Sequence, residues 1–229
     1  MTSSSVELNI EKARFNMVEQ QVRPAGVLNP DVVELFSIVK RELFVPAAYK
    51  GLAFADTEIP LGHGARMFLP SVEAQVIQGV GIRRHERVLE VGTGSGFMAA
   101  LLAVHAEHVW SMEIVPELAA QARLNLRRAN ISNVTVEIGN GLAGLAQQAP
   151  FDVIMISGAI TSIPQVLLDQ LKVGGRLFVI TGDAPAMQAQ LLTCVAGKAG
   201  IGKTTHLVTV FETVADALVP LEAEAHFVF

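Results

Sequence analysis

Two glycine-rich stretches of the sequence have the composition to hold a phosphorylated or nucleoside ligand. The first, RVLEVGTGSGF at residues 87–97, has three glycines directly after an apolar run. The second, GKAGIGKTT at residues 197–205, matches the phosphate-loop pattern of Gly, four residues, then Gly-Lys-Ser/Thr. The elements that flank each stretch decide which of them can form a ligand site.

The second stretch lacks the surroundings of a working phosphate loop. Such a loop lies between a strand and a helix, whose N-terminus and backbone amides hold the phosphates. Here Lys203 is followed by TTHLVTVFETV, in which Thr, Val and Phe favour a strand. Only about twenty-five residues follow, too few for a further strand with a magnesium-binding Asp. We therefore expect residues 197–205 to be an exposed connection between two antiparallel strands, with Lys198 and Lys203 in solvent and no phosphate bound.

The first stretch has those surroundings. A predicted strand ends at Val91 and a helix begins near Phe97, so the glycines lie beyond the carboxyl end of a strand, where open α/β sheets bind ligands. Glycine permits a tight turn and a close approach of the backbone to a ligand. The pattern is G-x-G-x-G, with Phe97 where the dinucleotide fingerprint has its third Gly, which favours S-adenosylmethionine over NAD.

Two later strand ends add polar groups that suit a nucleoside. Glu113 ends the next strand about seventeen residues after Gly96, and its carboxylate can accept hydrogen bonds from both ribose hydroxyls. Asn140 follows the third strand and can accept a hydrogen bond from an adenine amino group. A tight strand–helix turn without a ligand is the alternative. The expected cofactor contacts are Glu90, Gly92, Thr93, Gly94, Ser95, Gly96, Glu113, Ile114, Asn140 and Gly141.

Strands and helices alternate from residue 87 onward, which implies a parallel sheet covered on both faces. The expected strands lie at 87–92, 108–114, 134–139, 151–157 and 175–181, and the helices between them at 97–106, 116–130, 141–148 and 163–174. Two consecutive strands, 188–196 and 205–214, predict a late antiparallel hairpin, and residues 225–229 predict a last short strand. Before residue 84 we expect helices at 11–22, 29–40 and 71–81, and an irregular, functional loop at 44–70. Asn29 and Ser71 are the expected N-caps.

Composition excludes several classes of function. Hydrophobic residues make up 51% of the 229 residues and the mean hydropathy is +0.42, yet no apolar run reaches the roughly 18–20 residues of a spanning helix. The first residues do not resemble a secretory signal, and one cysteine without a Cys/His cluster gives no metal site. The formal net charge is −5 with no Lys/Arg run, which disfavours a nucleic-acid partner. We expect a cytoplasmic protein without membrane contact, as a monomer or weak homodimer.

Six stretches in order along the chain resemble protein-L-isoaspartate O-methyltransferases. They read MVEQQVRPAGV, RELFVPAAYKGLAFADTEIPLGHG, RVLEVGTGSGF, FDVIMISGA, LLDQLKVGGRLFVITG and LVPL. The resemblance implies a Rossmann-like class I methyltransferase sandwich with a mostly parallel seven-stranded sheet. We place this S-adenosylmethionine-binding core at residues 84–229, and an N-terminal helical addition with the acceptor-site loop at 1–83.

The resemblance also implies a reaction. The donor would be S-adenosylmethionine, the product S-adenosylhomocysteine, and the acceptor a carboxylate of damaged aspartyl residues in a protein or peptide, in protein repair. Gly92, Gly94 and Gly96 would line the methionine part of the donor, and Glu113 would hold the ribose. Asn140 stands where the family usually has Asp in a Gly-Asp-Gly turn, and retains an acceptor oxygen.

The acceptor side departs from the family pattern. After PLGHG the family usually continues Gln-Thr-Ile-Ser, any residue and Pro, with the Ser assigned to the active site. This chain reads ARMFLP, so that Arg66 replaces the Thr and Phe68 the Ser. The chain is therefore identified as a divergent member that lacks the usual serine.

Three residues of the acceptor loop are the candidates for catalysis. Arg66 can hold a substrate carboxylate through its two-pronged donors, Phe68 can wall an apolar acceptor, and His63 can orient an acceptor. No general base is required, because a carboxylate acceptor is already ionised near pH 7. Two alternatives stay open: a methyltransferase for a different small or protein acceptor, and a donor-binding module without isoaspartyl activity.

Overall fold

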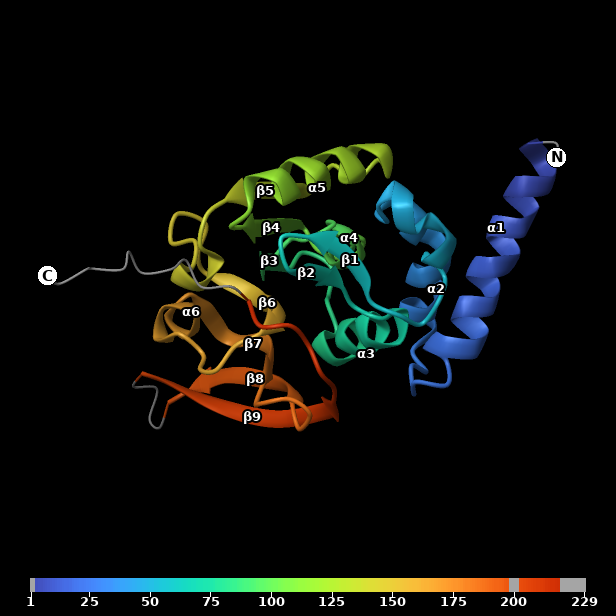
Figure 1. The fold of residues 1–229 in the computed structure, drawn as a ribbon. Helices are drawn as coiled ribbons and strands as arrows, with labels where there is room; N and C mark the ends of the chain where they lie inside the picture. The colour runs from blue at the N-terminus through green and yellow to red at the C-terminus, as the bar shows by residue number, and fades with distance from the viewer. Residues whose placement is uncertain (1–2, 198–201, 219–229) are drawn as a thin grey trace, which may run out of the picture.

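A seven-stranded sheet forms the centre of the computed structural model, which describes residues 3–197 and 202–218. The strand order is β5-β4-β3-β6-β7-β8-β9. The first five of these strands are parallel, β8 is antiparallel to β7, and β9 is antiparallel to β8. The bounds are β3 Arg87–Val91, β4 His108–Glu113, β5 Val134–Ile138, β6 Phe151–Ala159, β7 Leu171–Thr181, β8 Gln188–Ala196 and β9 Lys203–Glu212. The expected parallel sheet with a late antiparallel hairpin is confirmed (Figure 1).

Helices cover both faces of this sheet. The helical elements after β3 are α4 (Phe97–Ala103), α5 (Pro116–Arg128), the single 3-10 turn η4 (Gly141–Ala143) and α6 (Gln165–Asp169). Successive strand residues point to opposite faces, so Val88 belongs to the apolar core beneath α4 and α5, and Leu89 to the core on the side of α6. Burial on both faces explains why the strands read as continuous apolar runs.

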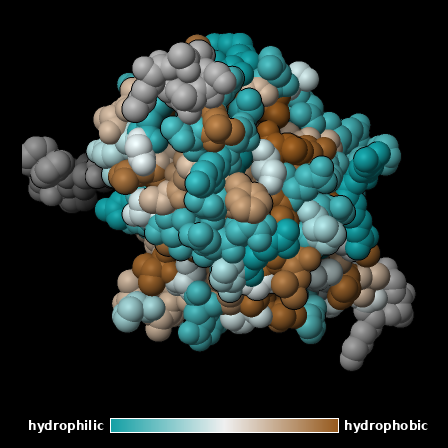
Figure 2. All heavy atoms as spheres, turned by 90° about the vertical axis from the view of Figure 1, so that its right-hand side faces the viewer, coloured by the Kyte–Doolittle hydropathy of each residue, from teal (hydrophilic) through white to brown (hydrophobic). Residues whose placement is uncertain are grey.

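The N-terminal part packs on the α4 side of the sheet. It consists of α1 (Ser3–Met17), which continues into the π-helical turn η1 (Val18–Val22), α2 (Pro30–Ile38) and α3 (Pro70–Val80). In Figure 1, α1 lies outermost, on the right-hand side. Figure 2 shows this side, where brown patches interrupt a largely hydrophilic surface; Leu8 and Phe15 of α1 are exposed.

The same apolar core continues from this N-terminal part into the part of the chain that forms the sheet. Phe36 of α2 and Phe97 of α4 meet edge to face, with their ring centroids 6.3 Å apart. The division of the chain at residues 83 and 84 stays a prediction.

One of the two expected helix caps is confirmed. The Asn29 side chain accepts a hydrogen bond from the Asp31 N–H at 3.0 Å and begins α2. Ser71 is not a cap, because α3 begins one residue earlier, at Pro70. Proline suits the first helical position, since it has no N–H that would need a hydrogen-bond partner. The Ser71 hydroxyl instead donates to the Asp56 carboxylate at 2.8 Å.

The segment at 44–70 is more regular than expected. It follows the short turn η2 (Arg41–Leu43) and holds the 3-10 helix η3 (Ala47–Leu52) and an antiparallel hairpin of β1 (Ile59–Gly62) and β2 (Ala65–Met67). The turn of this hairpin requires three successive left-handed residues, Gly62, His63 and Gly64, with φ of +88°, +52° and +77°. Glycine at both ends makes that turn possible.

The helix expected at 163–174 is shorter in the structure. It ends at Asp169, and Leu171 already belongs to β7, where it pairs with Phe151 of β6. The apolar residues after Asp169 are compatible both with a helix and with a buried strand. Because this segment pairs with β6, it forms a strand.

The phosphate-loop motif connects two antiparallel strands, as expected, but its last three residues already belong to β9, where Lys203 pairs with Ala196 of β8. Lys203 is exposed, as expected, and its ammonium group also donates to the backbone carbonyls of Asp169 at 3.0 Å and Leu171 at 2.6 Å. Gly197 is buried, not exposed. Lys198 and the strand expected at 225–229 lie outside the described residues, and the absence of phosphate stays a prediction. No helix in the described parts of the chain is long and apolar enough to span a bilayer.

Candidate active site

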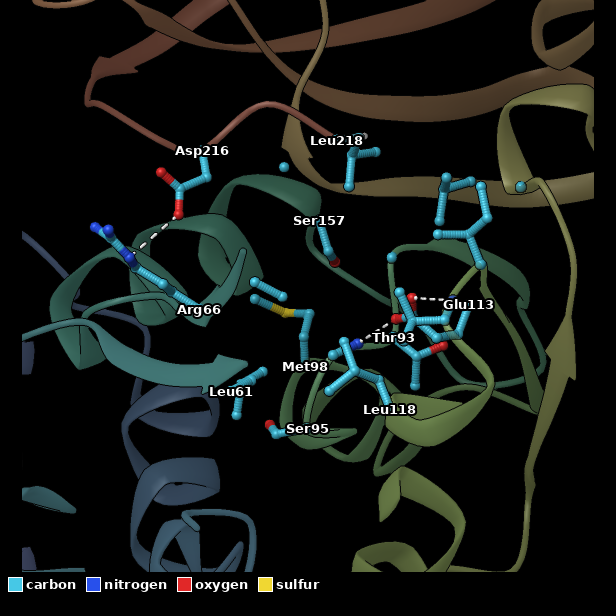
Figure 3. Close-up of a pocket in the computed structure, with 18 of the residues that line it drawn as sticks. Leu61, Arg66, Thr93, Ser95, Met98, Glu113, Leu118, Ser157, Asp216 and Leu218 are labelled. Carbon is cyan, nitrogen blue, oxygen red and sulfur yellow. Dashed lines mark hydrogen bonds and ion pairs between the residues drawn. The ribbon is translucent and has the colours of Figure 1, made fainter. Parts of the chain in front are cut away.

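One cavity opens at the carboxyl ends of the parallel strands. Its walls are the glycine-rich loop after β3, the ends of β4 and β5, the β1–β2 hairpin, and residues 216–218 near the C-terminal end of the described chain (Figure 3). The cavity therefore joins the predicted cofactor residues to the predicted acceptor loop, although the two lie about thirty positions apart in the sequence.

The glycine-rich loop needs its glycines for conformation and for space. Gly92, Gly94 and Gly96 have φ of +92°, +51° and +84°, a region that other residues rarely adopt. A Cβ on Gly92 would lie 3.0 Å from the Leu218 side chain, and one on Gly94 would lie 3.1 Å from Leu61. The backbone of this loop thus forms the surface of the cavity itself.

Glu113 is fixed in the wall by the backbone. Its Oε2 accepts a hydrogen bond from the Gly94 N–H at 2.8 Å, and its Oε1 accepts one from the Val115 N–H at 3.0 Å. Figure 3 shows both bonds as dashed lines. Each carboxylate oxygen keeps a further lone pair, so two hydroxyl donors can still be bound.

The end of β5 forms the next part of the wall. Asn140 lines the cavity, and its Oδ1 accepts a hydrogen bond from the Leu142 N–H at 3.0 Å, which starts η4. A Cβ on Gly141 would lie 2.7 Å from Val91 and 2.9 Å from Met112, so a side chain here would push into β3 and β4. Ile114, Thr93 and Ser95 also line the cavity.

Two predicted cofactor residues, Glu90 and Gly96, do not line the cavity. Gly96 faces Ala122 and Leu126 of α5. Glu90 lies fully buried behind the wall, where its carboxyl group accepts hydrogen bonds from Ser111 and, at 3.0 Å, from Ser157. Burial, and to a lesser extent the charge of nearby Glu113, raise the pKa of Glu90 to about 8 against the lowering effect of the two serine hydrogen bonds. Glu90 is thus held beneath the cavity wall by these two serines and braces the site from behind.

The three candidate acceptor residues all line the cavity. Arg66 donates to the Glu58 carboxylate at 3.0 Å and forms an ion pair with Asp216 at 3.4 Å. The hydrogen bond that Arg66 donates to Glu58 and the negative charges of Asp216 and Glu58 raise the pKa of Arg66. His63 is exposed in the hairpin turn, and Phe68 is half-buried against the apolar core.

The structure adds a buried ion pair that the sequence analysis missed. Arg41 donates from Nε to Glu73 at 3.1 Å, from Nη1 to the Ala53 carbonyl at 3.0 Å and from Nη2 to the Phe68 carbonyl at 2.7 Å. Glu73 lines the cavity, and burial raises its pKa to about 7 against the lowering effect of Arg41. A signal was present, because Glu73 shares a helix face with buried Ile77 and Val80.

No group of three or more His, Cys, Asp or Glu side chains able to hold a metal occurs among the described residues. The arrangement instead offers backbone N–H groups, acceptor oxygens and apolar walls. These suit a nucleoside and a reaction that requires positioning more than proton transfer.

Comparisons with known proteins agree with this arrangement. The family model for protein-L-isoaspartate(D-aspartate) O-methyltransferase matches residues 13–216. Protein-L-isoaspartate O-methyltransferase 1 of Syntrophobacter fumaroxidans is 40% identical over 185 residues, which cover 81% of this chain and 86% of the relative. The protein-L-isoaspartate O-methyltransferase of Methanoculleus marisnigri is 41% identical over 171 residues, which cover 75% of this chain and 78% of the relative.

A solved structure shares the fold. It is a putative protein-L-isoaspartate O-methyltransferase from Plasmodium falciparum in complex with S-adenosyl-L-homocysteine, with a TM-score of 0.74 and 19% identity, covering 89% of this chain and 97% of the other. The expected Rossmann-like methyltransferase fold is thereby confirmed. From the match along residues 13–216 and the identity with curated relatives, this chain belongs to the protein-L-isoaspartate(D-aspartate) O-methyltransferase family.

Proposed function

We propose that the protein is an S-adenosylmethionine-dependent O-methyltransferase that methylates a carboxylate of damaged, isoaspartyl-type residues in proteins or peptides. The observation that carries the proposal is the single cavity in which the glycine-rich loop and Glu113 face the β1–β2 hairpin. Family membership supplies the reaction class, and the cavity supplies a place where a donor and an acceptor can meet.

The wall residues fit the cofactor. The left-handed glycine loop lets a ligand approach the backbone, Glu113 has lone pairs left for ribose hydroxyls, and Asn140 has one left for an adenine amino group. Thr93, Ser95, Ile114 and Gly141 complete this cradle. When bound, S-adenosylmethionine supplies a methyl group on a sulfonium, and transfer to a carboxylate oxygen leaves S-adenosylhomocysteine and a methyl ester.

The protein's own residues then position and enclose the reactants. A carboxylate oxygen needs no base, so the walls contribute orientation and the exclusion of water. Leu61 of β1 and Leu218, the last described residue, both approach the glycine loop and make this part of the cavity apolar. Arg66, Phe68 and His63 form the acceptor side in this proposal.

A second candidate is methylation of a different acceptor. It is favoured by Phe68, which stands where the family usually has Ser, and by the two carboxylates that already surround Arg66. We also propose a cytoplasmic monomer or weak homodimer with the structural division at residues 83 and 84. Its mass in solution, measured by light scattering, tests the oligomeric state.

The decisive experiment combines two measurements on the full chain. Calorimetric titration with S-adenosylhomocysteine tests the cofactor site, and a labelled-donor assay compares an isoaspartyl peptide with the matched aspartyl peptide. Binding together with ester formation on the isoaspartyl peptide alone supports the proposal. Binding without ester formation removes the isoaspartyl assignment and leaves the second candidate or a donor-binding module; no binding removes both methyltransferase readings.

A further inference from the structure

The last described residues of the chain cross the mouth of the cavity. We call residues 213–218 the C-terminal strap. The Ala159 N–H at the end of β6 donates to the Asp216 carbonyl at 2.9 Å, and the Leu218 N–H donates to the Ala159 carbonyl at 2.9 Å. The strap is therefore held by backbone bonds that do not depend on the Asp216 side chain.

The Asp216 side chain points across the mouth toward the hairpin. Figure 3 shows its carboxylate directed at Arg66 of β2, with 3.4 Å between Oδ2 and the Arg66 Nε. Both side chains are about half exposed, at 52% for Arg66 and 47% for Asp216. A single long contact between exposed charges is weak and easily exchanged.

The guanidinium of Arg66 has five N–H donors, of which Glu58 and Asp216 each engage one group. The Asp216 group is an aspartyl carboxylate at the edge of a cavity whose proposed acceptor is also an aspartyl-derived carboxylate. Because Arg66 cannot lose its proton, it stays a carboxylate-binding group at every physiological pH.

Building on the proposed function, we propose that Arg66 binds the carboxylate of the acceptor and that Asp216 occupies this position until an acceptor arrives. The strap then acts as an internal competitor, and the acceptor binds only as tightly as the fraction of free Arg66 allows. Methylation removes the negative charge of the acceptor. The ester no longer competes for Arg66, so Asp216 returns and favours release of the product.

The test measures peptide binding separately from turnover. Calorimetry with S-adenosylhomocysteine present compares an isoaspartyl peptide with the same peptide carrying an amide in place of that carboxylate. Asp216→Asn removes the charge at constant size and should tighten isoaspartyl peptide binding about threefold. Arg66→Gln should weaken it about tenfold, with little effect on the amide peptide.

The double variant decides between competition and a simple structural link. If Asp216 acts through Arg66, then Asp216→Asn changes nothing in the Arg66→Gln background. Glu212→Gln is the matched control, since it removes one exposed charge at the end of β9 and lies outside the cavity. S-adenosylhomocysteine affinity should stay unchanged in all variants.

The outcomes separate this inference from the proposed function. If Asp216→Asn weakens peptide binding, or if it weakens cofactor binding, the strap is a structural latch and the inference is wrong. If no variant binds the isoaspartyl peptide better than the amide peptide, the inference is also wrong. Turnover of the peptide by the unaltered protein tests the proposed function alone, whatever the binding results.

Discussion

The donor and acceptor walls of the cavity are built from different parts of the chain. On the donor side, Gly92, Gly94 and Gly141 expose backbone, and Glu113 is held by two backbone N–H groups. On the acceptor side, the contacts are between side chains, above all Arg66 with Glu58 and Asp216. A wall made of backbone tolerates few replacements, whereas side chains on a hairpin can change the acceptor without disturbing the fold.

The largest expected effect lies beneath the acceptor wall. Arg41→Met leaves Glu73 buried without its partner and removes the bonds to the Ala53 and Phe68 carbonyls. Loss of one partner of a buried pair costs about 3–5 kcal/mol, which urea denaturation can measure. The double variant Arg41→Met, Glu73→Gln should recover part of this loss; a cost below about 1 kcal/mol would show that the pair does not support the wall.

The donor wall is tested by Glu113→Ala. It leaves the Gly94 and Val115 N–H groups without an acceptor and should weaken S-adenosylhomocysteine binding about 10- to 100-fold, as for hydrogen bonds to a charged group. Calorimetry measures this change. Glu113→Gln keeps one acceptor oxygen, so its affinity for S-adenosylhomocysteine should lie between those of the unaltered protein and the Ala variant. If the Ala variant bound S-adenosylhomocysteine as tightly as the unaltered protein, the donor wall would not depend on Glu113. The proposed contrast with the acceptor wall would then be wrong.

A third prediction concerns pH. The raised pKa of Glu90, about 8, means that the folded protein keeps this proton to a higher pH than the unfolded chain, whose value is near 4.5. Stability is therefore lost as pH rises from about 4.5 to about 8, with a slope of up to about 1.4 kcal/mol per unit. The pKa of Glu73 is also raised, to about 7, so this group lowers the free energy of unfolding further as the pH rises to about 7.

Denaturation curves at several pH values separate the two groups. Glu90→Gln should abolish the part of the slope between pH 7 and 8, and Glu73→Gln should leave that part intact. A Glu90→Gln variant with the unaltered slope would contradict the assignment.

The smallest effect is expected from Phe68→Ser, which restores the residue that the family usually has. Phe68 is half-buried, lines the cavity and has no role in the donor wall. We expect a several-fold rise in kcat/KM for an isoaspartyl peptide, about 1 kcal/mol of transition-state binding, with unchanged cofactor affinity. A fall in kcat/KM would indicate that Phe68 is matched to another acceptor.

The sequence alone predicted the parts of the molecule that depend on local pattern. Runs of apolar and β-branched residues identified all seven strands of the sheet. In the central strands these runs are continuous because both faces are buried. The exposed strand β9 was recognised from its Thr and Val residues. The sequence also predicted the donor wall, because its residues follow directly after predicted strands. Such residues lie together at the carboxyl edge of a parallel sheet. The phosphate-loop motif was correctly placed between two antiparallel strands because the residues after Lys203 favour a strand.

Only the tertiary structure decided what depends on distant pairs. Arg66 and Asp216 are 150 positions apart, and Arg41 and Glu73 are 32 apart, so no local pattern connects them. The same limit explains why Glu90 was expected among the cofactor contacts, since its burial behind the cavity wall arises from packing. The sequence thus determined the fold and the donor wall through local periodicity, while the acceptor wall was decided by contacts that form only when the chain folds.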